Sequence, residues 1–388
     1  MSIFLSNNRN NAYKKDFNEI YENYLKKWDL LEIEEGIYLR KKQYKIYDEQ
    51  LENIFPFTGI LEVLGKLNDV KPNEILFFDL ETTNKDSFSV SNLPFFMGFG
   101  YYQDGFFHLK QIFFLDSSKE VIALNYINNF IKKFKYIATY NGKRFDVPLL
   151  KNRFIYYSKE FIESFQHFDL FVFWKRLLPK QFEGGYSQKN LERKILQIYR
   201  ENDIDGSEVP KIYYDAIHYD QIDDLYKVIL HNEWDVYHLF LLMIESLRIL
   251  KNKKLQNLEL AKLFFRNKMY NESINILEKL KQNLGQNQEK LAVYDILYKT
   301  YWKLQDWEKA VKYLKEKLNY KKNPKEYLML IRILQNKLKK YKEAIYYLEE
   351  LMEFIGNFPE IKSQPYLKMN SLVERKRKLE KYESKTNP

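Results

Sequence analysis

The sequence predicts a two-part protein, in which an α/β domain with a mixed sheet flanked by helices spans residues 71–250 and an all-α repeat domain spans residues 255–356. Short apolar runs alternate with segments of helical period before residue 250, which is typical of an α/β fold. A two-helix unit recurs three times after residue 255, which indicates a helical repeat. The 388 residues, 45% of them hydrophobic, leave enough length for both cores.

The first domain begins after the chain break Lys71–Asn73 with the wholly apolar run Ile75–Phe78, which is typical of a buried central strand. Strands at residues 95–102 and 106–114 are expected to flank the turn Gln103–Gly105. The later elements are expected in the order helix, strand, helix, strand and one long helix. They lie at residues 117–133, at 136–140, from 147 onward, at 166–171 and at 222–250.

The repeat domain is predicted by three segments that align without gaps and begin with Tyr270, Trp307 and Tyr341, spaced 37 and then 34 residues apart. A small residue follows each aromatic by three positions, a branched aliphatic by four and a leucine by seven. An aliphatic residue precedes each aromatic by ten positions. This spacing is the tetratricopeptide period with two helices per unit. Generic amphipathic helices are the alternative. The aligned positions are Ser273, Ala310, Ala344; Ile274, Val311, Ile345; Leu277, Leu314, Leu348; and Leu260, Leu297, Ile331.

The two ends of the chain carry no chemical motif. Residues 1–70 are expected to be an accessory N-terminal segment with a helix at 18–28 and an extended piece at 36–47. Residues 357–388 are expected to be a charged C-terminal tail that frays from Arg375 onward.

The charge is distributed unevenly along a chain whose formal net charge is +10. Residues 251–388 hold 31 basic and 17 acidic residues, whereas residues 1–250 hold 32 basic and 36 acidic ones. A carboxylate-rich metal-binding domain joined to a polyanion-binding module has this distribution. The chain is also rich in Lys, Asn, Ile and Tyr, so a biased genome composition explains the lysine count equally well.

The sequence contains no cysteine, which excludes disulfides and thiolate zinc sites and favours a reducing cytoplasm. The apolar stretch at the N-terminus is shorter than that of a secretory signal. No run approaches the ~18 apolar residues of a membrane span. We therefore expect a cytoplasmic protein.

Asp79 and Glu81 lie at the end of the apolar strand and form the first of three acidic motifs. Because strand side chains alternate between faces, residues i and i+2 project together. Like charges so close call for a cation between them, and hard oxygen ligands suit Mg²⁺ or Mn²⁺. The alternative is a pair of solvated acids at a strand end.

The second motif, Asn141-x-x-x-Phe145-Asp146, directly follows another expected strand, so that Asp146 lies at a helix N-terminus. By itself this position favours a helix cap. The third motif is His231-Asn232-Glu233-Trp234-Asp235 in the last helix of the domain. Residues i and i+4 share a helical face, so His231 and Asp235 can share a site, although a surface hydrogen bond explains the pair alone.

Taken together, the three motifs are much more specific than any one of them. Their order, D-x-E, N-x-x-x-F-D and H-x-x-x-D, resembles the DEDD exonuclease superfamily. The surrounding sequence, over residues 30–250 and the repeats that follow, is similar to the YprB-type ribonuclease-H-like family with tetratricopeptide repeats. The similar segments are FFDLETT, FFMGFGYYQDGFFHLKQIFFLD, TYNGKRFDVPLLKNRF, HFDLFVFWKRLL, YSQKNLERKILQIYRENDIDGSEVPKIYYDAI and VILHNEWDVYHL.

Two features depart from the pattern of the family. Residues 84–91 read NKDSFSVS where the family often has a glycine-rich stretch, which bears on how closely a substrate end approaches there. His231 also precedes the last aspartate by four residues, whereas the commoner histidine subclass of the superfamily uses five. His231 is the candidate because position 230 is leucine.

The resemblance implies a ribonuclease-H-like fold and a 3′→5′ exonuclease that uses two divalent cations, Mg²⁺ or Mn²⁺. It implies that Asp79 bridges both cations, that Glu81 and Asp235 complete one site, and that Asp146 supports the other. His231 is the expected general base, because its ordinary pKa lies near neutrality. The resemblance favours DNA as substrate, a role in DNA repair and a helicase as protein partner.

The substrate and partner contacts are less specific. Lys143 and Arg144, with Asn141, adjoin Asp146 and are candidates for holding a backbone phosphate, although a solvated turn explains them as well. Stacking by Phe182, Tyr186 or Tyr213 is disfavoured against core packing, because the chain holds 61 Phe and Tyr residues. The alternatives left open are an RNA-trimming exoribonuclease of the same chemistry, an endonuclease, and a tetratricopeptide adaptor with an inactive nuclease domain. The basic repeats are expected to bind either nucleic acid or a protein.

Overall fold

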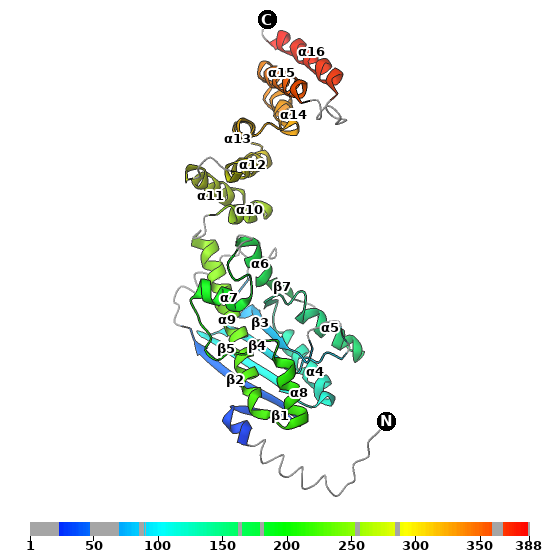
Figure 1. Ribbon diagram of the computed structural model, residues 1–388, viewed down its shortest axis with the longest axis vertical. Helices are drawn as coiled ribbons and strands as arrows, with labels where there is room; N and C mark the ends of the chain where they lie inside the picture. The colour runs from blue at the N-terminus through cyan, green and yellow to red at the C-terminus, as the bar shows by residue number, and fades with distance from the viewer. Residues whose placement is uncertain are drawn as a thin grey trace. The chain divides into compact units, whose positions relative to one another are not determined.

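The computed structural model describes residues 23–46, 70–84, 89, 91–161, 165–178, 182–252, 257–283, 288–358 and 368–386. The chain divides into two compact units, Met1–Lys254 and Leu255–Pro388 (Figure 1). The sequence pattern also changes near residue 250, and the expected domain bounds stay a prediction.

A mixed sheet forms the centre of the first unit, and its strand order in the described residues is β1-β2-β5-β4-β3-β6-β7. Strands β1 to β5 pair antiparallel with their neighbours, whereas β3, β6 and β7 run parallel to one another. The predicted mixed sheet flanked by helices is therefore confirmed. The strands are β1 (Leu30–Glu34), β2 (Ile37–Lys45), β3 (Ile75–Glu81), β4 (Phe96–Gln103), β5 (Phe106–Phe114), β6 (Tyr136–Thr139) and β7 (Gln166–Asp169).

Among the described residues of the N-terminal segment, Leu30–Glu34 and Ile37–Lys45 are strands of this sheet, which corrects the expectation of a separate accessory segment over residues 1–70. The extended piece expected at 36–47 is β2, which pairs along its whole length with β5. Residues 23–27 are helical, while residues 18–22 of the expected helix lie outside the described residues. Local patterns did not reveal the pairing because it joins residues about 70 positions apart.

The two faces of the sheet are covered by different helices, which the aromatic side chains of β3 identify. Phe78 stacks on Phe99 of β4, and Phe99 meets Phe130 of α4 with ring centroids 5.6 Å apart. Phe77 points to the opposite face and meets Phe240 of α9 at 5.3 Å. Because strand side chains alternate, Asp79 and Glu81 share the α9 face with Phe77.

The helices of the first unit follow the predicted order, with two local differences. The predicted strand at 166–171 ends at Asp169, whose carboxylate accepts the amides of Phe171 and Val172 and so begins α6. The helix expected at 117–133 begins with a 3-10 turn, Ser117–Lys119, which Asp116 caps, and α4 follows it. No helix in the described part of the chain is long and apolar enough to cross a membrane. The helices are α4 (Glu120–Ile131), α5 (Asp146–Tyr156), α6 (Leu170–Leu177), α7 (Gln188–Leu191), the π-helix η3 (Glu192–Leu196), α8 (Val209–Tyr219) and α9 (Leu225–Asn252).

The second unit is helical, and each aligned aromatic of the repeat begins a helix. Tyr270 begins α11, Trp307 begins α13 and Tyr341 begins α15. The small residues and the leucines of the alignment are fully buried. The small side chains let the paired helices approach closely. The tetratricopeptide assignment itself stays a prediction. The helices are α10 (Leu258–Arg266), α11 (Tyr270–Asn283), α12 (Gln288–Lys303), α13 (Trp307–Tyr320), α14 (Pro324–Ile333), α15 (Tyr341–Asn357) and α16 (Met369–Thr386).

Within the expected charged tail of residues 357–388, Met369–Thr386 form a packed helix, α16, where fraying from Arg375 onward was expected. In α16, Leu372 and Leu379 are 4% and 0% exposed. The ring of Tyr382 stacks on Tyr341 of α15 with centroids 5.6 Å apart, and the Arg375 guanidinium donates to Gln335. Two leucines seven positions apart share one helical face, so a narrow apolar stripe stabilises a highly charged helix.

Candidate active site

Asp79 and Glu81 lie at the C-terminal end of β3, where β3 extends beyond its parallel partner. The ladder between β3 and β6 ends at the pair Phe77–Ala138, so the later residues of β3 lack a strand on that side. Glu81 is 8% exposed and Asp79 is half-buried. The end of the ladder leaves room beside both carboxylates for groups from other elements.

Asp146 fills part of this room from the loop that follows β6. It is the first residue of α5, and its Oδ1 accepts the backbone amide of Leu80 in β3 at 3.2 Å. A Cβ on Gly142 would lie 2.8 Å from Asp146 Oδ2 and 2.5 Å from Thr139 Oγ1, so the loop passes too close for any other residue. Asp146 therefore contacts the sheet and is more than a helix cap.

His231 and Asp235 approach the same place from α9. His231 Nε2 lies 3.2 Å from Asp235 Oδ2 and 3.8 Å from Glu81 Oε1. Among the described residues, Glu81, His231 and Asp235 each offer one ligand atom within 4.8 Å of the others. The predicted one-turn spacing on the helix thus brings the imidazole and the carboxylate together over the end of β3.

A polar row across the sheet seats α9. Arg40, Gln111, Gly98 and Asp79 are directly opposite one another on β2, β5, β4 and β3. Asn232 of α9 lies above Gly98, where it donates to Asp79 Oδ2 at 2.9 Å and accepts from Gln111 Nε2 at 3.1 Å. A Cβ on Gly98 would lie 2.1 Å from Asn232 Oδ1, so glycine is required for this contact.

The same row anchors the next residue of α9. Glu233 is 3% exposed and pairs with the buried Arg40, with Lys42 Nζ at 2.6 Å and with the Tyr44 hydroxyl. Arg40 also donates to Gln111 Oε1 at 2.9 Å. Breaking a buried ion pair is strongly destabilising. These contacts therefore fix how α9 is rotated about its own axis. Asn232 and Glu233 thereby orient His231 and Asp235.

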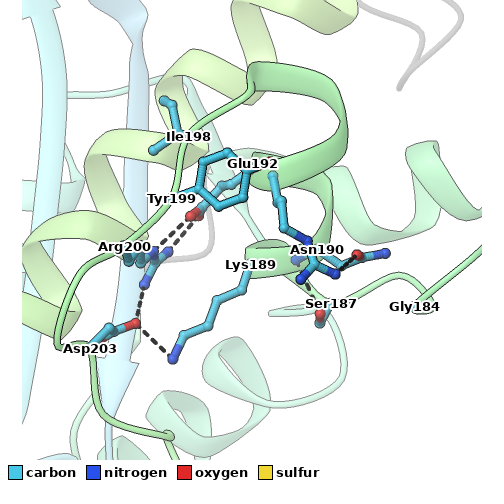
Figure 2. A pocket seen from close by; sticks show the side chains of 10 residues that line it. Gly184, Ser187, Lys189, Asn190, Glu192, Ile198, Tyr199, Arg200 and Asp203 are labelled. Atoms are coloured by element: carbon cyan, nitrogen blue, oxygen red, sulfur yellow. Dashed lines mark hydrogen bonds and ion pairs between the residues drawn. The ribbon is translucent and has the colours of Figure 1, made fainter.

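Three charged residues that the sequence reasoning missed surround His231 and Asp235. Asp203 Oδ1 lies 2.7 Å from His231 Nδ1. Arg200 Nη2 lies 2.6 Å from Asp235 Oδ1, and its Nη1 lies 3.1 Å from Asp203 Oδ2. Glu192 accepts from Nε of Arg200 at 2.7 Å and also from Nη2, the nitrogen that contacts Asp235 (Figure 2). No sequence motif marks these residues, because they come from the π-helix and the irregular segment after it.

The pKa values of Asp79, Glu81 and Asp146 reflect how closely the predicted carboxylates lie to one another. Burial, and then the charges of Asp235, Glu81 and Asp146, raise the pKa of Asp79 well above its usual range. Burial and the nearby acids, opposed by His231, raise the pKa of Glu81 to about 8. Burial, Asp169 and Asp235 raise the pKa of Asp146 to about 7. Carboxylates from β3, α5 and α9 therefore share one environment of like charge.

The surrounding acids favour the charged form of His231, whereas they disfavour the charged form of one another. Burial lowers the pKa of His231, but Asp235, Asp203 and Glu81 outweigh this effect and raise it to about 9. Burial opposes ionisation of Asp203 too, yet hydrogen bonds from His231 and Lys189 hold its pKa well below the usual range. Asp203 therefore remains a carboxylate that accepts the Nδ1 proton, and Nε2 faces Glu81 and Asp235.

The donor set fits divalent cations. Hard cations take carboxylate oxygens, and a cluster of acids with raised pKa values lacks the positive charge that would keep all of them ionised. Asp79, Glu81, Asp146 and Asp235 are the residues that would hold the cations, and His231 stands beside them. Arg200 contacts Asp235 through one nitrogen, Nη2.

The remaining candidates lie around this cluster with weaker support. Asn141 has a left-handed backbone with φ 61°, and its amide donates to Asp169 at 2.9 Å. Lys143 and Arg144 are exposed in the same loop, and their substrate roles stay predictions. Tyr213 packs in the core as expected, with its ring 4.3 Å from that of Phe95. Phe182 and Tyr186 are half-buried and stack with centroids 6.0 Å apart, while residues 85–88 and 90 of the departing segment lie outside the described residues.

Without cations, the stability of the protein is expected to fall as the pH rises from about 5 to 9. Glu81 has a raised pKa of about 8, so the folded state holds a proton that the unfolded state releases at lower pH. The stabilisation from protonated His231 is complete below its ordinary pKa and is lost as the pH rises through about 9. The measurement is the unfolding temperature in a chelator across this range.

Mg²⁺ or Mn²⁺ is expected to reverse this loss, because cations replace the departing protons. At saturating cation and pH 8 the unfolding temperature should rise by roughly 5–10 °C, and much less at pH 5. Asp79→Asn should weaken the effect, whereas Asp104→Asn in an exposed turn should leave it intact. An equal rise at both pH values, or in both variants, would contradict cation binding at this cluster.

Comparisons with known proteins agree with the fold and its location in the chain. Residues 76–246 match the model of the RNase H superfamily, a range that includes all four carboxylates and His231. The chain is 26% identical over 317 residues, 78% of its length, to YprB of Bacillus subtilis (strain 168), a protein described as uncharacterized, of which the match covers 74%. The first unit thus has a ribonuclease-H-like fold, and the chain is similar to YprB over both units.

Proposed function

We propose that this protein is a metal-dependent 3′→5′ exonuclease that hydrolyses phosphodiester bonds of DNA. The observation that carries the proposal is the cluster of Asp79, Glu81, Asp146 and Asp235 beside the buried His231, built from β3, α5 and α9. The match of residues 76–246 to the RNase H superfamily supports nucleic-acid hydrolysis as the reaction. The DNA substrate, the polarity and a role in repair rest on the resemblance to the YprB-type family.

In this proposal the carboxylates hold two divalent cations, Mg²⁺ or Mn²⁺. When bound, such cations lower the pKa of water and neutralise charge on the phosphate oxygens. Asp79 would serve both cations, Glu81 and Asp235 would complete one site, and Asp146 would support the other. Asn232 holds one oxygen of Asp79 by its 2.9 Å hydrogen bond, which fixes the direction of the remaining lone pairs.

His231 acts as general base. Asp203 accepts the Nδ1 proton, which leaves Nε2 of the neutral ring as a proton acceptor on the side of Glu81 and Asp235. Positive charge at the carboxylate cluster opposes protonation of the ring, so its pKa falls from about 9 when the cluster is neutralised. Asp203 and the helix α9 orient the ring, and no covalent enzyme intermediate is needed.

The direct test is digestion of polynucleotides labelled at one end. Single-stranded and double-stranded DNA and RNA, labelled at either the 5′ or the 3′ end, are incubated with Mg²⁺ or Mn²⁺. Stepwise shortening of 5′-labelled DNA supports the proposal, whereas preferential shortening of RNA supports an exoribonuclease. Internal cuts in a circular substrate would indicate an endonuclease. A pure protein that hydrolyses none of them would leave the adaptor interpretation.

The basic second unit is expected to increase the affinity of the protein for nucleic acid. Residues 251–388 carry 31 basic and 17 acidic residues, and each phosphate neutralised by a protein steepens the fall of affinity with salt. Removing residues 255–388 should therefore weaken DNA binding and flatten the plot of log affinity against log salt. Fluorescence anisotropy of a labelled oligonucleotide measures both. Unchanged affinity and slope would assign the repeats to a protein partner.

A further inference from the structure

A cavity of about 360 Å³ lies beside the carboxylate cluster, between α7, the π-helix η3 and the segment that follows it (Figure 2). Ligand pockets in proteins begin near this size, at ~300 Å³. The π-helix ends at Gln197, whose backbone is left-handed with φ 59°, and the chain then turns back along the cavity. π-helical turns occur frequently at functional sites. No role in the proposed hydrolysis has yet been given to this cavity.

The floor of the cavity is shared with the candidate active site. Arg200 and Asp203 line it, and they contact Asp235 at 2.6 Å and His231 at 2.7 Å respectively. Figure 2 shows Arg200 between Asp203 and Glu192, and Lys189 reaching Asp203 from the other side. A molecule in the cavity would therefore lie one side chain away from the proposed general base.

The acidic groups of the cavity are already neutralised. Hydrogen bonds from His238 and Arg200 outweigh burial and hold the pKa of Glu192 at about 2, so it is a carboxylate paired with a guanidinium. Asp203 is paired with Lys189, Arg200 and His231. These pairs leave the cavity without uncompensated negative charge on its floor.

Arg193 supplies the positive charge of the cavity. Among the described residues it has no ion-pair partner, and the nearby Glu183 is bound to Lys194 at 2.9 Å. The Arg193 guanidinium donates to Oδ1 of Asn190 at 3.0 Å. Asn190 is itself 5% exposed and is fixed by the carbonyls of Glu183 and Gly185 at 2.8 and 2.6 Å. A buried amide thus orients an exposed guanidinium that keeps most of its donors for a ligand.

Tyr199 supplies a flat aromatic surface at the mouth. It lines the cavity and is 71% exposed, the largest exposed fraction among the large hydrophobic side chains of the described residues. A ring held so far in water gains little from the core and is available to stack on a planar ligand. Aromatic rings beside a cationic groove are the usual means of binding unpaired bases.

We propose that this cavity is a nucleotide subsite, in which Tyr199 stacks on a base and Arg193 binds a phosphate of the strand being cut. The inference rests on the proposed function, because it identifies the ligand as the nucleotide next to the scissile bond. A guanidinium and an exposed ring that line one cavity match the phosphate and the base of one nucleotide. Arg200 and Asp203, which line the cavity, also contact Asp235 and His231, so this nucleotide would lie next to the proposed site of cleavage.

The first experiment measures binding without catalysis. Deoxyadenosine 5′-monophosphate is titrated into the full-length protein in a chelator, and binding is followed by calorimetry. Tyr199→Ala should weaken binding about 5- to 100-fold, the range found when a stacked aromatic is removed, and Tyr199→Phe should retain it. Arg193→Gln should weaken binding by about tenfold, as for loss of a charged hydrogen bond, and Arg193→Lys by less. Inorganic phosphate should bind more weakly than the nucleotide and be insensitive to Tyr199→Ala.

A matched control is Tyr156→Ala. Tyr156 is 58% exposed and lies at the end of α5 opposite to Asp146, so its removal should change neither binding nor turnover. Equal effects of Tyr199→Ala and Tyr156→Ala, or nucleotide binding unaffected by both Tyr199→Ala and Arg193→Gln, would overturn the subsite. Circular dichroism of each variant checks that the fold is retained.

The second experiment separates this inference from the proposed function. On a DNA oligonucleotide, Tyr199→Ala should raise KM about tenfold and leave kcat within about threefold, because stacking holds the strand without entering the chemical step. If the wild-type protein hydrolyses no polynucleotide, the proposed function fails, yet loss of mononucleotide binding in Tyr199→Ala still supports the subsite. If hydrolysis is robust and Tyr199→Ala changes neither KM nor mononucleotide binding, the subsite fails alone.

Discussion

Replacing Asp79 by asparagine is expected to reduce hydrolysis by at least about 10³-fold and at the same time to stabilise the cation-free protein. Cations at such a site supply several kcal/mol of charge stabilisation, and each 1.36 kcal/mol corresponds to about tenfold in rate. Loss of hydration, and then the charges of Asp235, Glu81 and Asp146, raise the pKa of Asp79 well above the usual range. A neutral amide of the same shape removes this repulsion, so the variant should unfold at a higher temperature in a chelator.

The two effects are measured on the same samples, with single-turnover digestion for the rate and thermal unfolding at pH 8 for stability. Asp146→Asn should show the same pair of changes, because burial raises the pKa of Asp146 to about 7. Asp104→Asn, at an exposed turn, should show neither. Full activity in Asp79→Asn would refute the site, and lost activity with lost stability would indicate only a folding defect.

Replacing His231 by alanine is expected to lower the rate of hydrolysis by roughly 10²–10⁴, the usual contribution of a general base. The reason is geometric. Asp203 fixes Nδ1 at 2.7 Å, and Nε2 points toward Glu81 and Asp235. The carboxylates that would hold cations remain in the variant, so stabilisation by Mg²⁺ should persist while the chemical step slows.

Single-turnover rates at saturating substrate isolate this chemical step from binding. The pH–rate profile of the wild type should rise through the pKa of the base, and His231→Ala should lose that limb. His218→Ala, on the exposed surface of α8, is the matched control. A loss of less than about threefold at the pH optimum would assign proton removal to another group, and a loss of Mg²⁺ stabilisation would assign His231 to cation binding.

The predicted site residues were found because each depends on local geometry. Asp79 and Glu81 share a face because strand side chains alternate, and His231 and Asp235 share one because a helix repeats every 3.6 residues. The strands that carry Asp79 and precede Asp146 were predicted from short apolar runs that admit few other structures. The limits of β5 at Phe106 and Phe114 match the prediction because a glycine turn and a polar segment bound the strand.

The residues that were missed depend on geometry that no local pattern encodes. Asp203 and Arg200 come from irregular backbone after a π-helix, where side-chain directions follow no period. The row that seats Asn232 depends on the register of four strands, and register is a property of long-range pairing. β1 and β2 were left out of the sheet for the same reason. α16 was read as a tail because two buried leucines are inconspicuous among many charges.

The position of α9 at the end of the first unit has a consequence for the newly made chain. A ribosome releases Asp79 and Asp146 long before it releases His231 and Asp235, and domains fold as units from the N-terminus. Until α9 has emerged, the growing polypeptide holds three of the four acids, Asp79, Glu81 and Asp146, and lacks the complete helix that aligns them. In the proposed enzyme, the site is thus completed last, after translation has passed the whole first unit, so a chain that is released before α9 is made would lack hydrolytic activity.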